Sequence, residues 1–166
     1  MTESMLWKAR DRGLLDLHLH QIRDYSLDRH HKVDDTPYGG GGGMVMKPEP
    51  VFEAIETVLG LNSAQTPPEP ASNIPIILLT PQGRVFDQSI AQELSQHPHI
   101  VLICGRYEGV DERIREHLVT DEISIGDYVL TGGELPALIL IDAIARLLPD
   151  VLGDPTGAQD DSHAMG

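Results

Sequence analysis

The sequence predicts an α/β fold, built on a mostly parallel β-sheet with helices on both of its faces. Residues 74–79 form a continuous apolar run with the composition of a strand that is buried on both sides, and the largely apolar run 99–104 is predicted to form a second strand. Segments with helical periodicity alternate with these runs, as they do in βα units. Both runs, and a short strand expected at 122–125, lead into polar loops that contain glycine. Since ligands of open α/β sheets bind beyond the carboxyl ends of the strands, we expect a ligand site at that edge.

Length and composition indicate a single globular domain. The chain has 166 residues, of which 40% are hydrophobic and 23% charged, as in ordinary soluble proteins. The single cysteine, Cys104, excludes an internal disulfide and fits a reducing compartment. No apolar run reaches the roughly 20 residues of a membrane span, and the N-terminus lacks the apolar core of a signal peptide. We therefore expect a cytoplasmic protein with no membrane partner.

The charge distribution leaves two interpretations open. The net charge of -14 argues against a generic nucleic-acid binder, because phosphate contacts need clustered Lys and Arg. Six of the twelve basic residues nevertheless lie within the first 32 positions. The basic residues either form one basic face or are scattered over a solvated surface.

The first quarter of the chain combines a helix, a strand and a long polar loop. A helix is predicted at 4–12, ending at Gly13. Residues 15–20 alternate apolar and polar side chains, which predicts a half-buried strand with Asp16, His18 and His20 on its solvated face rather than a metal site. Residues 21–43 form a polar stretch that ends in five consecutive glycines, either a flexible hinge or a loop that closes over a substrate.

The remaining elements are expected in alternating order. Helices are predicted at 49–60, 87–96, 111–117 and 134–148, and a proline-containing surface linker at 62–73. Pro50 suits a first helical turn, and the short helix 111–117 carries charged pairs on an exposed face. The helix 134–148 is apolar nearly all round, so it must be covered on more than one side, which suggests a subunit interface.

Four motifs in order carry a resemblance to a known family. They are Val33 to Gly41 with Gly43 to Met46, Pro81-Gln82-Gly83, Gly105 to Arg113, and Ser124 to Leu130 with Gly132-Gly133-Glu134. Together they resemble the TrmD family, bacterial tRNA (guanine-N1)-methyltransferases of the SPOUT class. The resemblance runs from about residue 5 to residue 163.

This resemblance implies a fold, a cofactor and a reaction. The fold is an α/β domain with a C-terminal trefoil knot, assembled as a homodimer, with S-adenosyl-L-methionine (AdoMet) in the knot loops. The methyl group goes to N1 of the guanosine immediately 3′ of the tRNA anticodon. The residues that the resemblance places around AdoMet are Thr80, Pro81, Gly83, Gly105, Tyr107, Glu108, Ile125, Gly126, Asp127, Tyr128, Val129, Leu130, Gly132, Gly133 and Pro136.

The resemblance also implies the residues of the reaction. Guanine N1 carries a proton, so methylation needs a base and stabilisation of negative charge on the purine. Asp161 matches the family's general base, Arg146 the arginine that stabilises or orients the target base, and Glu108 a ligand of a magnesium ion. Without the resemblance, Asp161 is a solvated charge, Arg146 a surface ion pair and Glu108 a helix cap.

Two departures from the family pattern qualify these expectations. Relatives open with a strand before the helix predicted at 4–12, and they continue into a helical domain that grips tRNA. We therefore expect a methyltransferase domain at 1–152 and the start of an interdomain linker at 153–166, with tight tRNA binding dependent on the further domain. The alternatives are a non-catalytic AdoMet-binding fragment and a SPOUT methyltransferase that acts on ribosomal RNA.

Overall fold

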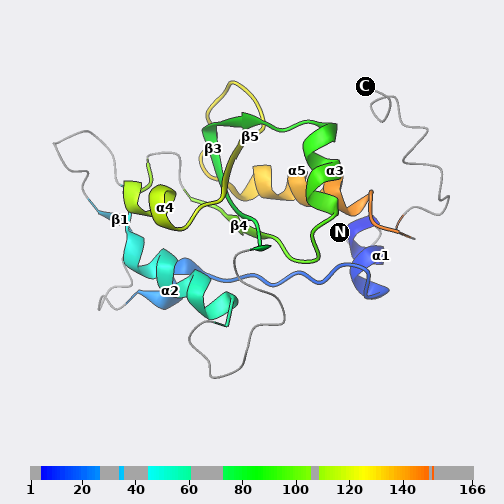
Figure 1. The fold of residues 1–166 in the computed structure, drawn as a ribbon, viewed down its shortest axis with the longest axis horizontal. Coiled ribbons are helices and arrows are strands. Elements are labelled where there is room, and N and C mark those ends of the chain that lie inside the picture. The colour runs from blue at the N-terminus through cyan, green and yellow to red at the C-terminus, as the bar shows by residue number, and fades with distance from the viewer. Residues whose placement is uncertain are drawn as a thin grey trace.

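The core of the protein is a three-stranded parallel sheet (Figure 1). The computed structural model describes residues 5–26, 34–35, 45–60, 73–105, 109–149 and 151. Its strand order is β4-β3-β5, with β3 at Ile76–Val85, β4 at Val101–Ile103 and β5 at Asp121–Ser124. Ile76 pairs with Val101 on one side of β3, and Ile77 pairs with Asp121 on the other. The predicted α/β class and parallel sheet are confirmed.

Two short antiparallel strands form a separate ribbon. β1 (Asp34–Asp35) pairs with β2 (Val45–Met46), in the register Asp34 to Met46. A 3-10 helix, η1 (Ile22–Tyr25), precedes this ribbon. The prediction that 21–43 lacks structure was therefore wrong at these positions, because local turns and a distant partner supply backbone hydrogen bonds that composition does not reveal. The remaining residues of that stretch lie outside the described part of the chain, as does most of the linker predicted at 62–73.

Within the described residues, five α-helices lie on or beside the sheet. They are α1 (Met5–Asp11), α2 (Pro48–Val58), α3 (Gln88–Ser95), α4 (Glu112–His117) and α5 (Glu134–Ala145). α2 and α4 lie on one face, α3 and α5 cover the other, and α1 packs against α5 (Figure 1). The predicted helices on both faces are thus confirmed.

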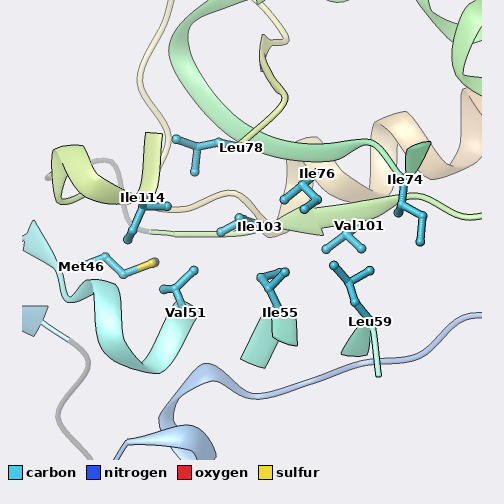
Figure 2. Packing of buried hydrophobic residues seen from close by; sticks show 10 residues of the cluster. All are labelled: Met46, Val51, Ile55, Leu59, Ile74, Ile76, Leu78, Val101, Ile103 and Ile114. Atoms are coloured by element: carbon cyan, nitrogen blue, oxygen red, sulfur yellow. The ribbon is translucent and has the colours of Figure 1, made fainter. Parts of the chain in front are cut away.

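Successive residues of β3 divide the core into two layers. Ile76 and Leu78 face α2 and α4, in the cluster drawn in Figure 2. Ile77 and Leu79 face the opposite way, against α3 and α5. Leu78 is fully buried, and removing a side chain of that size to Ala costs about 2–5 kcal/mol in comparable cores. The continuous apolar run of β3 is therefore explained by burial on both faces.

Helix ends follow the local chemistry of the sequence. Gly13 adopts a φ of 72° just beyond α1, where its N–H donates to the carbonyl of Arg10. Asp87 caps α3, because its carboxylate accepts a hydrogen bond of 2.9 Å from the N–H of Ile90. Asp111 caps α4 in the same way, through the N–H of Arg113 at 3.0 Å.

The half-buried strand predicted at 15–20 is not formed. Asp16, His18 and His20 are exposed as expected, but no strand pairing is assigned to this segment in the described chain, and Leu19 is 86% exposed. Alternation predicts which side chains share a face, but a strand also needs a neighbour for its backbone hydrogen bonds. The two histidines have local partners instead: His18 lies 2.9 Å from Asp16, and His20 lies 3.0 Å from the Tyr25 hydroxyl.

α5 is apolar on all sides, as predicted. Pro136, Ala137 and Leu140 are buried against the sheet. Leu135, Leu138 and Ile139 are respectively 62%, 41% and 47% exposed. Within the described residues, no helix has both the length and the apolar character to cross a membrane.

Candidate ligand-binding site

The loops that follow β4 and β5 meet at the carboxyl edge of the sheet. The N–H of Gly133 donates a hydrogen bond of 2.9 Å to the carbonyl of Gly105. A Cβ on Gly133 would lie only 2.9 Å from the Cα of Cys104, so the two chains are in backbone contact. Any side chain at this position would separate them. Two of the three predicted ligand loops are thus brought together.

The end of the Val33 to Met46 motif joins the same edge. The N–H of Met46 donates to the carbonyl of Gly109 at 3.1 Å, and the N–H of Asp111 donates to the carbonyl of Met46 at 3.2 Å. A Cβ on Gly105 would lie 2.6 Å from the Met46 methyl carbon. Three of the family motifs are therefore neighbours in space, although about 85 residues separate the first from the last.

A buried serine fixes the turn after β5. The Ser124 hydroxyl, which is 4% exposed, donates to the carbonyl of Gly126 at 2.9 Å and lies 3.2 Å from its N–H. Gly126 has a φ of 156°, and a Cβ there would lie 2.4 Å from the ring of Tyr128. The Tyr128 hydroxyl donates to the carbonyl of Ile125 at 3.4 Å. Ser124 opens one of the four family motifs but was not among the predicted ligand residues, although a serine two residues before a glycine is typical of such turns.

The predicted loop at 80–84 is a short excursion within β3. Leu79 and Arg84 both pair with Ile123, so residues 80–83 leave the ladder and return at the same position on β5. The prediction that this strand ends at residue 79 was therefore wrong, because the chain pairs with β5 again at Arg84 and Val85. A Cβ on Gly83 would lie 2.4 Å from the backbone of Glu122, which gives this glycine a packing role.

The surroundings of the edge combine peptide groups with apolar side chains. Ile125 and Leu130 are half-buried, Pro136 is buried, and Thr80 is 6% exposed. Peptide N–H and C=O groups can read the edge of a purine, and an apolar wall can cover its face. Asp127, Tyr128 and Val129 are exposed beside this wall. These donors and surfaces fit a nucleoside-containing ligand such as AdoMet.

Cys104 does not provide a reactive thiol at this edge. Burial raises its pKa to about 11, and the nearby carboxylate of Glu134 adds to the effect. A thiol with this pKa is protonated at neutral pH and is a poor nucleophile. Cys104 is therefore a half-buried small side chain that packs at this edge without reacting.

The residues predicted to carry the chemistry are only partly described. Arg146 is half-buried at the C-cap of α5, where its N–H donates to the carbonyl of Asp142 at 3.2 Å. Tyr107, Glu108 and Asp161 lie outside the described residues. Among the residues that are described, no group of three or more His, Cys, Asp or Glu side chains could hold a metal ion.

A separate, open cavity lies beside the excursion of β3. Its volume is about 340 Å³, and charged side chains dominate its lining. The lining residues are Gln82, Gly83, Arg84, Arg115, Val119, Thr120, Asp121 and Glu122. Gly105 and the loop 125–133 take no part in it, so this cavity is distinct from the edge where the predicted AdoMet loops meet.

Comparison with known proteins identifies the family. The model of the family described as tRNA (Guanine-1)-methyltransferase TrmD matches residues 1–166. The chain belongs to the TrmD family. This confirms the resemblance found in the motifs, and it makes the clustering of those motifs at one edge a feature of a TrmD-type domain.

Individual TrmD relatives agree along nearly the whole chain. A tRNA (guanine-N(1)-)-methyltransferase of Dehalococcoides mccartyi strain 195 is 57% identical over 164 residues, which is 99% of this chain and 63% of the relative. The protein of the same description from Moorella thermoacetica is 54% identical over 166 residues, which is 64% of its length. This chain therefore spans a little less than two thirds of the length of these curated relatives.

A solved structure of the same family shares the fold. The crystal structure of tRNA (m1G37) methyltransferase from Aquifex aeolicus matches with a TM-score of 0.77 and 40% sequence identity. The match covers 93% of this chain and 65% of the Aquifex chain.

Proposed function

We propose that this chain is the AdoMet-dependent domain of a tRNA methyltransferase that modifies N1 of the guanosine immediately 3′ of the anticodon. The observation that carries the proposal is the hydrogen bond between Gly133 and Gly105, which joins two family motifs at the carboxyl edge of the sheet. Membership of the TrmD family supports the reaction, and the Aquifex structure, named for m1G37, supports the target nucleoside.

In this proposal, AdoMet binds among the loops of the carboxyl edge. Gly105, Gly126 and the pair Gly132-Gly133 let the ligand approach the backbone, and Ile125, Leu130 and Pro136 form the apolar wall. Tyr107, Asp127, Tyr128 and Val129 border the ligand, and Thr80, Pro81 and Gly83 contribute from the excursion of β3. We further propose that the segment from β3 to α5 is threaded as the trefoil knot of the family.

The reaction requires a proton to leave guanine as the methyl group arrives. N1 attacks the methyl carbon, the carbon–sulfur bond breaks with its electron pair on sulfur, and S-adenosylhomocysteine is released. Asp161 accepts the N1 proton as general base. Arg146, at the end of α5, stabilises the negative charge that develops on the purine. A magnesium ion held through Glu108 would favour deprotonation by polarising the purine oxygen.

We propose that the functional unit is a homodimer in the cytoplasm, where its tRNA substrate resides. The support is the exposed apolar face of α5, formed by Leu135, Leu138 and Ile139, together with the exposed Val129. Apolar faces of this kind mark protein interfaces. Residues 1–152 form the methyltransferase domain, and 153–166 begin the linker that carries Asp161 toward a partner tRNA.

The donor site is tested by calorimetry with S-adenosylhomocysteine. We expect the wild-type chain to bind it and Gly126→Trp to abolish binding, because a side chain at Gly126 collides with Tyr128. Gly13→Trp is the matched control: it also replaces a glycine of positive φ, but no atom lies within 4 Å of the added Cβ. Equal binding heats for the wild type and Gly126→Trp would contradict the site.

The catalytic step is tested with Asp161→Asn. In a full-length context that includes the tRNA-binding domain of the relatives, the variant should lose methylation of a tRNA transcript with guanosine after its anticodon, while S-adenosylhomocysteine binding is retained. Joint loss of binding and methylation would show that Asp161 is structural. A chain that binds S-adenosylhomocysteine but methylates no RNA would support the alternative of a non-catalytic AdoMet-binding fragment. Methylation of ribosomal RNA alone would support the alternative of a SPOUT methyltransferase that acts on ribosomal RNA.

A further inference from the structure

Two arginines hold the excursion of β3 in place from outside the ligand edge. We call residues 80–83 the excursion loop. Its two ends meet the same residue, because Leu79 and Arg84 both pair with Ile123 of β5. Gly83 is in close backbone contact with β5, since a Cβ there would lie 2.4 Å from Glu122. Side-chain contacts hold the neighbouring residues Gln82 and Arg84.

The first contact is made by Arg84, at the end of the excursion loop. Its Nη2 lies 2.6 Å from Asp121 at the start of β5 and 3.0 Å from Glu93 on α3. Its Nε adds contacts of 3.2 Å to both oxygens of Asp121. The hydrogen bond to Asp121 raises the pKa of Arg84, so the guanidinium stays charged throughout the physiological range. One side chain thus links the loop to a strand and a helix.

The second contact is made by Arg115, on α4. Its Nη2 donates to Oε1 of Gln82 at 3.3 Å. Its Nε lies 3.1 Å from Oε1 of Glu122, which is a charge contact outside hydrogen-bond geometry, so the Nε proton has no acceptor in line. A weaker contact of 3.7 Å reaches Glu112 on the same helix. Arg115 therefore touches the excursion loop, α4 and β5.

These three segments are the ones that carry the ligand loops. The excursion loop supplies Thr80 and Pro81, α4 begins within the Gly105 to Arg113 motif, and β5 leads into the turn at Ser124. A displacement of Gln82 away from Arg115 would move Thr80 and Pro81 relative to the other two loops. A side chain that joins all three segments can set their relative positions without touching the ligand.

We propose that Arg84 and Arg115 are positioning residues for AdoMet, which hold the excursion loop so that Thr80 and Pro81 face the donor. This inference rests on the proposed function, because it assumes that AdoMet occupies the carboxyl edge. It also explains the charged cavity, because the two arginines that line this cavity hold the loop of the neighbouring ligand site in position.

The test compares S-adenosylhomocysteine affinity and methylation kinetics in matched variants. Arg115→Met and Arg84→Met should each weaken the affinity about 5- to 10-fold and raise the KM for AdoMet, with the KM for tRNA within twofold of wild type. Arg84→Lys should recover part of the loss, because Lys keeps the charge but cannot form the same forked contact. Gln82→Ala, an exposed change that leaves both arginines in place, should reproduce the effect of Arg115→Met. Arg10→Met, an equal change of charge at an exposed position of α1, should have no effect.

The outcomes separate this inference from the proposed function. The positioning role would be overturned if the wild type binds S-adenosylhomocysteine and Arg84→Met, Arg115→Met and Gln82→Ala all bind it with the same affinity. The donor site itself would then stand. The positioning role would also be overturned if these variants have a lower active fraction and a lower kcat while their KM values stay unchanged. That result would indicate that the arginines only stabilise the fold. Absence of binding by the wild type would overturn the proposed function, and this inference with it.

Discussion

Substitution of Gly83 by Ala tests whether packing, rather than a ligand, requires glycine at this position. The added Cβ would lie 2.4 Å from both the carbonyl carbon of Glu122 and the N of Ile123. Ordinary contacts begin near 3.4 Å, so the strand backbone must shift by about 1 Å. Overpacking in a core costs typically about 1–3 kcal/mol, and a collision with the backbone of a neighbouring strand belongs at the upper end. We therefore expect Gly83→Ala to lower the free energy of unfolding by about 3 kcal/mol.

Urea denaturation monitored by circular dichroism measures this loss. Gly13→Ala is the control, since its positive φ of 72° costs roughly 1–2 kcal/mol but the added methyl group meets open space. Both variants should unfold with the wild-type dependence on urea, so that the midpoints report stability alone. A Gly83→Ala protein no less stable than Gly13→Ala would refute the close contact between the excursion loop and β5.

Three further predictions concern single side chains. Ser124→Ala should lower stability by about 1–2 kcal/mol in urea titrations and weaken S-adenosylhomocysteine binding, because both hydrogen bonds to Gly126 are lost; an unchanged affinity would separate this turn from the ligand. Asp87→Ala should cost about 1 kcal/mol, since the N–H of Ile90 loses its cap, whereas Asp87→Asn should retain most of the stability; equal losses in the two variants would contradict the capping role. Cys104 should resist thiol reagents at pH 7, and stability should fall as pH rises from 9 to about 11, because the folded state holds the thiol proton that the unfolded state releases near 9.0; rapid labelling of the native protein at pH 7 would disprove this.

Local patterns in the sequence were sufficient to predict most of the elements. The apolar run of β3 and the stop at Gly13 each depend on neighbours in sequence, and each is found in the structure. The prediction that α5 is apolar nearly all round was also correct, because this property depends only on the composition of the segment. The ligand edge was predicted from glycines at strand ends, and the contact of Gly105 with Gly133 agrees with that expectation.

Features that depend on distant partners could not be predicted in this way. Residues 15–20 alternate like a strand but have no assigned strand neighbour in the described chain, so the periodicity was misleading. The return of Arg84 to Ile123 depends on β5, about 40 residues later. The contact of Arg115 with Gln82 spans 33 positions and has no local signature. Sequence motifs identify the residues that approach a ligand. They do not as readily identify the residues, such as Arg115, that hold the ligand loops in place.

Amide hydrogen exchange measures directly whether AdoMet binds where the loops after β4 and β5 meet. Exchange would be measured by mass spectrometry with and without saturating S-adenosylhomocysteine. We predict slower exchange in 103–105 and 124–133, with α2 unchanged as an internal reference. Protection confined to the charged cavity around Arg84 and Arg115, or no protection at saturation, would contradict binding at this edge.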